Sequence, residues 1–417
     1  MIIPSIDLMD GKAVQLEQGK KKILERDNPL DLAKEFRKYG EIAVIDLDAA
    51  LGVGNNLKII KEICKIADCR VGGGIRTIKK ANELLQAGAK KIIIGTKATP
   101  LFLKQLPKAR VIVAIDTKDQ FIVTKGWKNK TNKTPFEVIK ETETYCSEFL
   151  FTNVDREGLM QGVDLDAIKK IRKATKNTIT IAGGITTLED INSLESLNTN
   201  SQIGMALYTN KINLADAVTN LLDFKKNNGL IPTITQDTNN QVLMLAYSSK
   251  ESLKKSFKTN KACYYSRSRK KLWAKGETSK NYQEIIKIRY DCDRDTLLFT
   301  VKQKNVACHL GKYSCFNEKE FTPEILYETI KNRIDFPREN SYTSKIAKDE
   351  KAIMKKIREE SLEIIDYKNK ENLIWEIADL QYFLLVLMAK KGITLKEISN
   401  ELWRRNKWNL PILKITK

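Results

Sequence analysis

The sequence predicts a multidomain protein: a (β/α)8 TIM barrel built from two similar halves, then a small strand-rich α+β domain, then an all-α domain. The first half of the chain alternates β-rich runs with amphipathic stretches, which is typical of a parallel sheet covered by helices. Shorter strand-like runs follow, and helical periodicity replaces them towards the end. We expect domains at 1–222, 229–317 and 318–417, with a polar linker at 223–228.

An internal repeat predicts the barrel. The apolar strand that ends at Asp7 has a counterpart that ends at Asp116, 109 residues later, and Gly73-Gly74 recurs as Gly183-Gly184. Two halves with four strand signals each make eight strands. Because such barrels place catalytic groups where strands end, the two aspartates should face each other as general acid and general base. The alternative is that they cap the following helices.

Glycines in both halves indicate two phosphate sites on opposite sides of the barrel mouth. Bare backbone amides near helix amino termini bind anions. Two phosphate sites with an acid–base pair between them predict a substrate that is phosphorylated at both ends. The residues concerned are Gly73, Gly74, Gly95 and Thr96 in the first half, and Gly183, Gly184 and Gly204 in the second.

These motifs give the first 222 residues a strong resemblance to a family of histidine-biosynthesis isomerases. The resemblance rests on Ile3-Pro4-Ser5-Ile6-Asp7, Gly126-Trp127 and Asp155-Arg156-Glu157-Gly158, among others. The family acts on phosphoribosyl-formimino-aminoimidazole carboxamide ribotide. A sister cyclase shares the half-barrel repeat, but Gly126-Trp127 is typical of the isomerase.

The isomerase resemblance implies an Amadori rearrangement of an aminoaldose to an aminoketose. Asp7 is then the base and Asp116 the acid, Thr152 assists them, and Trp127 stacks on the substrate. Leu159 stands where the family usually has threonine.

A metal site is predicted where Asp291-Cys292-Asp293-Arg294-Asp295 is followed by Cys308-His309 and Cys315. Carboxylates and thiols packed this densely are costly without a cation. Thiolates select a soft ion such as Zn²⁺, and carboxylates a hard ion such as Mg²⁺. Three thiolates leave a fourth tetrahedral position open, which favours a catalytic zinc. The segment therefore predicts hydrolysis by water that is activated on the metal.

The strand-rich region closely resembles phosphoribosyl-AMP cyclohydrolase, also through Tyr265-Ser266-Arg267-Ser268-Arg269 and Lys275-Gly276-Glu277-Thr278-Ser279. The resemblance implies opening of the adenine ring. His309, the only histidine of the chain, is a candidate for proton transfer or metal contact. Arg267 and Arg269 are candidates for binding phosphate, and the alternative is an exposed basic strand face. The implied ligands, drawn from two subunits for zinc, are Cys292, Cys308 and Cys315 for Zn²⁺, and Asp291, Asp293 and Asp295 for Mg²⁺.

A carboxylate cluster marks the helical region. Helical spacing puts Glu360 with Glu363, and Glu376 with Asp379, on single faces. The second pair lies in an apolar helix, where uncompensated carboxylates are costly, so we expect Mg²⁺ there. A solvated face is the alternative for Glu359 and Glu360.

This pattern resembles the all-α nucleotide pyrophosphohydrolases, and more specifically phosphoribosyl-ATP pyrophosphohydrolase. Ser341-Tyr342-Thr343-Ser344-Lys345, Lys356 and Ala378-Asp379-Leu380-Gln381-Tyr382 carry the resemblance. It implies magnesium-assisted release of pyrophosphate, with Lys356 as a substrate-binding residue. Phe383 stands where that family usually has histidine.

The three resemblances form consecutive steps and predict a trifunctional enzyme of histidine biosynthesis. Its expected substrates are phosphoribosyl-ATP, phosphoribosyl-AMP and the formimino ribotide. One alternative is that one or more modules are inactive and serve as a scaffold. Another is that the helical module hydrolyses ordinary nucleoside triphosphates.

Charge and cysteine content indicate which binding partners and which cellular compartment to expect. The net charge of +21 is spread along the chain, which favours polyphosphorylated substrates over nucleic acid. Seven cysteines without framework spacing, and the lack of a signal-like apolar run, predict a reducing cytoplasm. The longest apolar run, 383–389, is too short to span a bilayer, so we expect no membrane association. Shared zinc ligands predict at least a homodimer.

Overall fold

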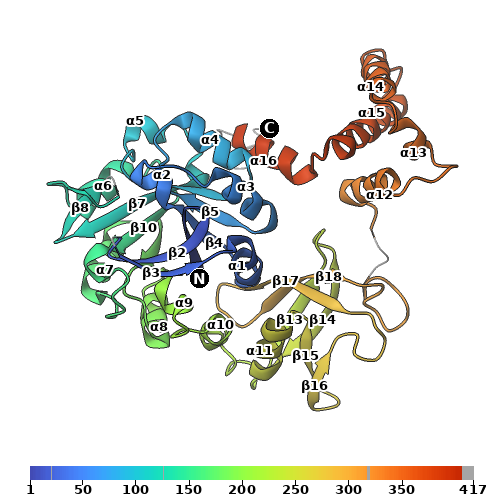
Figure 1. Cartoon of the computed structure of the whole chain (residues 1–417). Helices are drawn as coiled ribbons and strands as arrows, with labels where there is room; N and C mark the ends of the chain where they lie inside the picture. Colours follow the sequence, from blue (N-terminus) through green and yellow to red (C-terminus); the bar gives the residue numbers. More distant parts are fainter. Residues whose placement is uncertain (20, 125, 317–319, 406–417) are drawn as a thin grey trace, which may run out of the picture. The chain divides into compact units, whose positions relative to one another are not determined.

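The computed structural model describes the chain except for residues 20, 125, 317–319 and 406–417 (Figure 1). It confirms the predicted fold class of barrel, strand-rich region and helical region in that order. The chain divides into two compact units, of which one contains residues 1–318 together with 403–417 and the other contains residues 319–402. The barrel and the strand-rich region therefore belong to one unit.

Eight parallel strands close the barrel. Their order is β10-β11-β12-β1-β4-β5-β6-β7, and β7 pairs with β10 to complete the ring. The apolar residues of these strands are almost all buried, as expected for a parallel sheet covered by helices. The strands are β1 (Ile2–Met9), β4 (Ile42–Asp46), β5 (Cys69–Gly72), β6 (Lys91–Ile94), β7 (Val111–Lys118), β10 (Glu148–Asn153), β11 (Thr178–Ala182) and β12 (Asn200–Ile203).

Amphipathic helices cover the barrel, and each turns an apolar stripe inward, as α3 does with Ile60, Ile63 and Cys64. Thr77 and Thr187 cap equivalent helices of the two halves, each accepting a bond from a backbone amide three residues on. The longer helices are α1 (Pro29–Phe36), α3 (Leu57–Ile66), α4 (Ile78–Gln86), α6 (Pro135–Thr142), α7 (Leu165–Ala174), α8 (Leu188–Ser196) and α10 (Leu214–Leu221); the short ones are α2 (Leu47–Leu51), α5 (Pro100–Leu103) and α9 (Met205–Tyr208).

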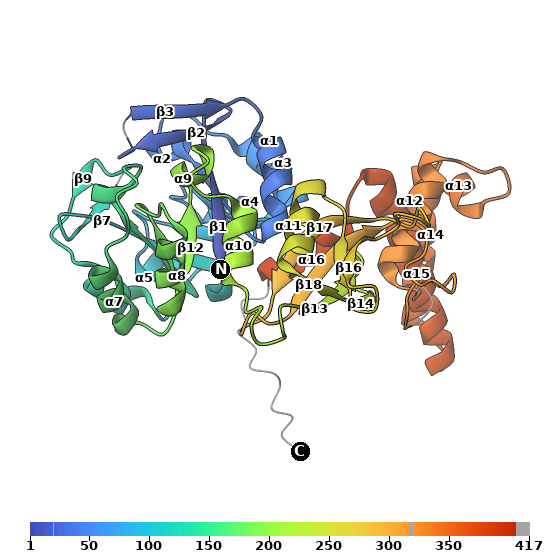
Figure 2. The same ribbon diagram turned by 90° about the horizontal axis from the view of Figure 1, so that it is seen from below.

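The half-barrel repeat is visible in two antiparallel extensions. Strand β1 pairs with β2 (Lys12–Glu17), which pairs with β3 (Lys21–Arg26). Strand β7 likewise pairs with β8 (Phe121–Thr124), which pairs with β9 (Asn129–Lys130). Figure 2 shows β2 and β3 as a dark blue pair of arrows at the edge of the barrel. Both extensions follow the strands that carry the two candidate catalytic aspartates.

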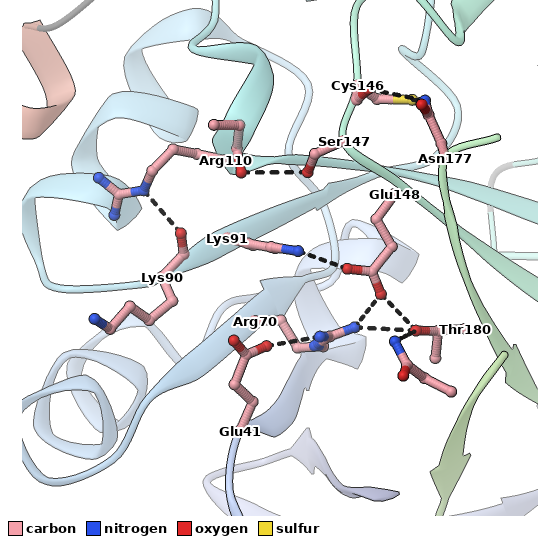
Figure 3. Close-up of polar contacts among 12 residues, drawn as sticks. Glu41, Arg70, Lys90, Lys91, Arg110, Cys146, Ser147, Glu148, Asn177 and Thr180 are labelled. Atoms are coloured by element: carbon pink, nitrogen blue, oxygen red, sulfur yellow. Dashed lines mark hydrogen bonds and ion pairs between the residues drawn. The ribbon is translucent and has the colours of Figure 1, made fainter. Parts of the chain in front are cut away.

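A buried charge cluster closes the end of the barrel where the strands begin (Figure 3). Arg70 contacts Glu148 and lies 2.6 Å from Glu41, while Lys91 lies 2.7 Å from the second oxygen of Glu148. Arg70 also donates to the hydroxyl of Thr180 at 3.2 Å. Burial would raise the pKa of Glu148, but Arg70 and Lys91 hold it below its ordinary value.

The strand-rich region consists of a four-stranded sheet in the order β14-β13-β18-β17, a hairpin and one helix. At its core the ring of Tyr264 stacks on Phe299, and its hydroxyl bonds Thr235 and Gln283. The elements are β13 (Ile231–Gln236), β14 (Val242–Ser248), α11 (Lys250–Thr259), β15 (Cys263–Ser266), β16 (Lys271–Ala274), β17 (Gln283–Tyr290) and β18 (Leu297–Gln303).

The strand-rich region packs against the end of the barrel where the strands begin. Tyr39, shortly before β4, stacks on Phe257 of α11 with ring centroids 4.5 Å apart. The ammonium group of Lys38 donates to the Phe257 carbonyl at 3.1 Å, and Lys287 lies 2.5 Å from Asp68, just before β5. These contacts make a mixed apolar and ionic interface.

The second unit is helical. Ile353, Leu385 and Val386 form the centre of its core. Helix α15 is, among the described residues, the one helix long and apolar enough to cross a membrane by length and composition, properties that the core helix of a soluble bundle shares. The helices are α12 (Pro323–Asp335), α13 (Tyr342–Ile346), α14 (Glu350–Ile365), α15 (Lys370–Lys391) and α16 (Leu395–Arg405), whose last residues are counted with the first unit.

Candidate active sites

The barrel mouth holds a cavity of about 400 Å³. It lies at the carboxyl ends of the strands, where barrel enzymes keep their catalytic groups. Every barrel residue that the sequence singled out lines this one cavity: Asp7, Gly73, Gly74, Gly95, Thr96, Asp116, Trp127, Thr152, Gly183, Gly184 and Gly204.

Asp7 and Asp116 lie in different electrostatic settings. Burial raises the pKa of Asp7 to about 6, and a 2.8 Å bond from the Ser5 hydroxyl opposes that rise. Burial also raises the pKa of Asp116, against hydrogen bonds from Trp127 and Thr152. Thr152 is the register partner of Asp116 on the neighbouring strand β10, which explains its position. Two carboxyls with raised pKa values in one cavity are suited to proton transfer near neutral pH.

The paired glycines are required by the backbone at both predicted phosphate sites. A Cβ atom on Gly73 would lie 2.1 Å from the carbonyl oxygen of Asp46, and one on Gly184 would lie 2.4 Å from that of Gly162. Both residues have positive φ angles, +97° and +80°, which glycine adopts without strain. The loops after β5 and β11 therefore pass close to neighbouring backbone and leave room for an anion in the cavity.

Other polar side chains line the cavity without having been singled out in the sequence. One of them is Glu157, and burial, with Asp7 and Asp116 adding to it, raises its pKa to about 8. Glu157 lies in the family motif Asp155-Arg156-Glu157-Gly158, and its place in that motif could have marked it as a candidate site residue. The other charged side chains are Arg76, Lys133 and Glu141, and the uncharged polar ones are Ser5, Thr99, Thr124, Thr131 and Gln202.

The three cysteines that were predicted to bind zinc do not come together within a single chain. Cys308 is buried and hydrogen-bonds Cys315, whereas Cys292 is exposed on the loop after β17. Among the described residues, no group of three potential ligands within 4.8 Å contains a cysteine. Lys275 is buried beside the Cys308–Cys315 pair and donates to the carbonyl of Ala307 at 2.5 Å. The sequence placed Lys275 in a family motif but gave it no role.

The carboxylates of the same region do gather. Asp291, Asp293 and Asp295 place one oxygen each within 4.8 Å of the others. Lys226, from the predicted linker, lies 2.7 Å from Asp293 and 2.5 Å from Asp295, and its hydrogen bonds hold the pKa of both below their ordinary values. In this structure the cluster is paired with the ammonium group of Lys226.

The remaining predicted residues of this region are exposed. His309 follows Cys308 directly but lies on the surface. Arg267 lies over the ring of Tyr247 at 3.8 Å, and Arg269 lies over Trp273 at 5.7 Å. Both guanidinium groups therefore rest on aromatic rings and are open to a phosphate ligand.

A second carboxylate group lies between α14 and α15. Glu360, Glu363 and Glu376 lie within 4.8 Å of one another, and Glu360 and Glu376 are buried. The hydrogen bond with Glu376 is the main cause that raises the pKa of Glu363. Asp379 is half-buried on α15 outside this trio. Three converging carboxylates are stable with a shared proton or a cation.

Basic and aromatic groups border the trio. Lys356 lies 2.8 Å from Glu359 and 3.4 Å from Glu360. Phe383 is buried against Tyr382 and Tyr342. The position that is usually histidine in the family is thus part of an aromatic cluster here.

Comparison with known proteins decides the family. Residues 1–213, half of the chain, match the model for histidine biosynthesis protein. The chain belongs to this family. Residues 244–317 match phosphoribosyl-AMP cyclohydrolase, and residues 324–406 match phosphoribosyl-ATP pyrophosphohydrolase. An isomerase, a cyclohydrolase and a pyrophosphohydrolase domain therefore follow one another in one polypeptide, and the recognition made from sequence is confirmed.

Individual relatives cover either the first or the second half. The imidazole-4-carboxamide isomerase of Methanocaldococcus jannaschii is 46% identical over 231 residues, which is 52% of this chain and 98% of the relative. The isomerase of Archaeoglobus fulgidus is 38% identical over 229 residues, which is 52% of this chain and 96% of the relative. The histidine biosynthesis bifunctional protein HisIE of Pyrococcus furiosus is 44% identical over 200 residues, which is 45% of this chain and 96% of the relative. This histidine-biosynthesis chain thus joins two halves that have separate relatives.

Proposed function

We propose that the chain catalyses three consecutive reactions. The helical module hydrolyses phosphoribosyl-ATP to phosphoribosyl-AMP and pyrophosphate, the strand-rich module opens the adenine ring, and the barrel isomerises the resulting aminoaldose to an aminoketose. One observation carries the proposal: a cavity with an acid–base pair between two glycine-lined loops lies in the same chain as cyclohydrolase and pyrophosphohydrolase domains. Each product is the next substrate.

The barrel residues account for an Amadori rearrangement. Asp116 donates a proton to the ring oxygen of the aminoaldose, so that the sugar opens to an imine. Asp7 then removes the proton from the neighbouring carbon to give an enolamine, and the aminoketose forms when the first carbon gains a proton and the hydroxyl on the second carbon loses one. Asp7, with a pKa of about 6, is mostly ionised at neutral pH and suits the base. Thr152 and Trp127 orient Asp116 through hydrogen bonds.

The strand-rich module fits two kinds of cation. Cys308, Cys315 and a Cys292 from a second copy are soft ligands for Zn²⁺, and the Asp291–Asp293–Asp295 group is a hard oxygen site for Mg²⁺. Zinc would supply a Lewis acid that activates water, and magnesium would neutralise phosphate charge. Arg267 and Arg269 hold the phosphates, and His309 is the group available for proton transfer.

The helical module fits Mg²⁺ in the same way. The trio of Glu360, Glu363 and Glu376, with Glu359 and Asp379 beside it, offers only oxygen ligands. Lys356 is positioned at the edge of this group to bind a phosphate of the substrate. The carboxylates would hold Mg²⁺, and the ion would neutralise the triphosphate and assist attack by water with release of pyrophosphate.

We further propose that the enzyme is at least a homodimer. The separation of Cys292 from Cys308 and Cys315 supports a cyclohydrolase site shared by two copies. Exposed apolar side chains on α15 give a second surface that a copy would cover, since soluble monomers rarely expose such patches. They are Ile374, Trp375, Ile377 and Leu384. The seven free cysteines support a reducing, cytoplasmic compartment.

The test supplies the purified full chain with phosphoribosyl-ATP, Zn²⁺ and Mg²⁺, and follows all products by mass spectrometry and by chromatography against standards. The proposal expects the aminoketose as end product, with phosphoribosyl-AMP and the aminoaldose as transients. Accumulation of either transient without further conversion would refute the activity of the next module. Hydrolysis of ATP or dNTPs as fast as phosphoribosyl-ATP would favour a general pyrophosphohydrolase.

A further inference from the structure

The loop between β17 and β18 carries the three aspartates in a backbone conformation that needs support. Residues 291–296 form this loop, which we call the aspartate loop. An oxygen of Asp291 shapes it by accepting hydrogen bonds from the amides of Asp295 and Thr296, at 3.1 and 3.2 Å. Arg294 has a φ of +65°, a left-handed conformation that is unfavourable for a residue with a side chain. Such a residue keeps this conformation only where surrounding contacts hold it.

Two contacts of Arg294 come from outside the strand-rich region. The amide of Asp223, the first residue of the predicted linker, donates to the Arg294 carbonyl at 2.9 Å. The guanidinium group of Arg294 lies 3.5 Å from the carboxylate of Glu195, near the end of barrel helix α8. The second oxygen of Glu195 lies 3.3 Å from the amino group of Met1, just before β1 begins. All four residues belong to one compact unit. The backbone of Arg294 is thus anchored on the linker, and its side chain on the barrel.

Partial burial gives the Glu195–Arg294 pair more weight than an exposed pair. The side chain of Glu195 is 18% exposed and that of Arg294 is 32% exposed. Water and salt therefore screen this pair less than they screen a fully exposed one. Among the described residues, Arg294 forms its ion pair with Glu195 and with neither adjacent aspartate. Those aspartates lie against Lys226 of the linker instead. The guanidinium group thus ties the aspartate loop to the barrel.

We propose that Glu195 of the barrel is a positioning residue of the cyclohydrolase site, and that through Arg294 it holds the aspartate loop in the conformation that brings its carboxylates together for a divalent cation. The inference rests on the proposed magnesium role of this loop. Glu195 is not among the residues that line the barrel cavity, and it lies beside the start of β1, at the end of the barrel opposite the mouth. Its role therefore serves the neighbouring module and not the isomerase chemistry. The barrel contributes in this way to a second reaction of the same chain.

The test compares the full-length wild type with Glu195→Gln, Arg294→Gln and the double variant. Glu189→Gln on α8 and Arg289→Gln on β17 are matched controls, because each removes the same charge from an exposed position nearby in sequence. The probe is Mn²⁺, which favours the same oxygen ligands as Mg²⁺, and its Kd is measured from the paramagnetic resonance signal of the free ion. Asp293→Asn shows which part of the binding belongs to the aspartate loop. Hydrogen exchange of the metal-free proteins reports on the loop itself, and melting temperatures show that the variants are folded.

The proposal expects Glu195→Gln and Arg294→Gln each to weaken Mn²⁺ binding at the loop roughly 3- to 5-fold. Both should also speed hydrogen exchange over residues 290–297, while the controls change neither quantity. The double variant should be no worse than the single ones, because either change already breaks the pair. Charge alone predicts the opposite for Arg294→Gln, since the loss of a positive group would tighten the binding of a cation. Tighter binding by that variant would therefore overturn the positioning role.

Hydrogen exchange separates this proposal from the proposed magnesium role. If exchange over residues 290–297 is the same in all variants, Glu195 does not hold the loop and the proposal is wrong. The proposal is also wrong if exchange responds but the Kd does not, or if the effects of the two single variants add in the double variant. If the wild type and Asp293→Asn bind Mn²⁺ equally, the magnesium role of the loop fails, and faster exchange in Glu195→Gln and Arg294→Gln still establishes that the barrel holds the loop.

Discussion

Replacement of Glu148 by glutamine removes a carboxylate that contacts both Arg70 and Lys91. Glu148 is fully buried and Arg70 is 1% exposed, so water cannot take over the lost contacts. Arg70 would keep only Glu41 as a charged partner, at 2.6 Å, and Lys91 would lose the acidic partner seen here. The variant therefore leaves buried positive charge without compensation.

The expected loss is large. Breaking a buried ion pair by removing one partner costs about 3–5 kcal/mol. In a domain of the size of this barrel, each kcal/mol lowers the melting temperature by about 2–4 °C, so the loss is roughly 6–20 °C. The pKa of Glu148 in the folded chain lies below its ordinary value, so the ionised carboxylate stabilises the fold fully at pH values above that ordinary value. This stabilisation is lost as the pH falls through the lowered pKa. The difference between wild type and variant should therefore shrink in acid.

Calorimetry and circular dichroism of the full chain at pH 7 and at pH 4 measure this effect. Glu62→Gln is the control, because Glu62 forms an exposed pair with Lys65 and exposed pairs contribute about 0–1 kcal/mol. If Glu148→Gln melts no lower than Glu62→Gln at pH 7, the cluster does not stabilise the barrel as an ion-pair network. Below its melting temperature the variant should retain the wild-type KM for the aminoaldose, since the cluster lies away from the mouth.

Three further predictions concern the sites. Asp7→Asn should lower the isomerase kcat about 10²- to 10⁴-fold, and the wild-type rate should fall as the pH drops below about 6, where Asp7 binds a proton; a rate that is independent of pH from 5 to 7 would contradict the base role. Cys292→Ser and Cys308→Ser chains should each lack ring opening, yet co-expression should restore it through mixed dimers that contain one intact site, and no recovery would mean that the site lies within one chain. Glu376→Gln should abolish pyrophosphate release while purified phosphoribosyl-AMP is still converted, and loss of both reactions in a folded variant would refute independent modules.

The residues that line the barrel cavity could be predicted from sequence because the reactive side chains and the glycines recur at equivalent positions in the two halves. Asp7 and Asp116 end equivalent strands, and an eight-stranded barrel must bring such ends to one mouth. The glycines were equally readable, since Gly73 and Gly184 are required by close backbone approaches that few other residues permit. Thr152 followed from its family position and proved to be the register partner of Asp116.

Other features depend on tertiary environment and could not be read from the chain. The raised pKa of Glu157 arises from burial and from two carboxylates, Asp7 and Asp116, that are distant in sequence. The family resemblance implied zinc ligands from two subunits, but only the structure shows that Cys292 on the loop after β17 forms no three-ligand group with Cys308 and Cys315 within one chain. Arg70 carries no motif, and only the closed strand order shows that Glu148 lies beside it.

The charge cluster also bears on where ligands enter and leave the barrel. Arg70 and Glu148 are buried at the end of the barrel where the strands begin, whereas the described residues that line the cavity lie towards the opposite end. Under the proposed function, the substrate would enter and the aminoketose would leave at this same end of the barrel. Fusion in this chain fixes equal numbers of the isomerase, cyclohydrolase and pyrophosphohydrolase domains, whatever route an intermediate takes between them.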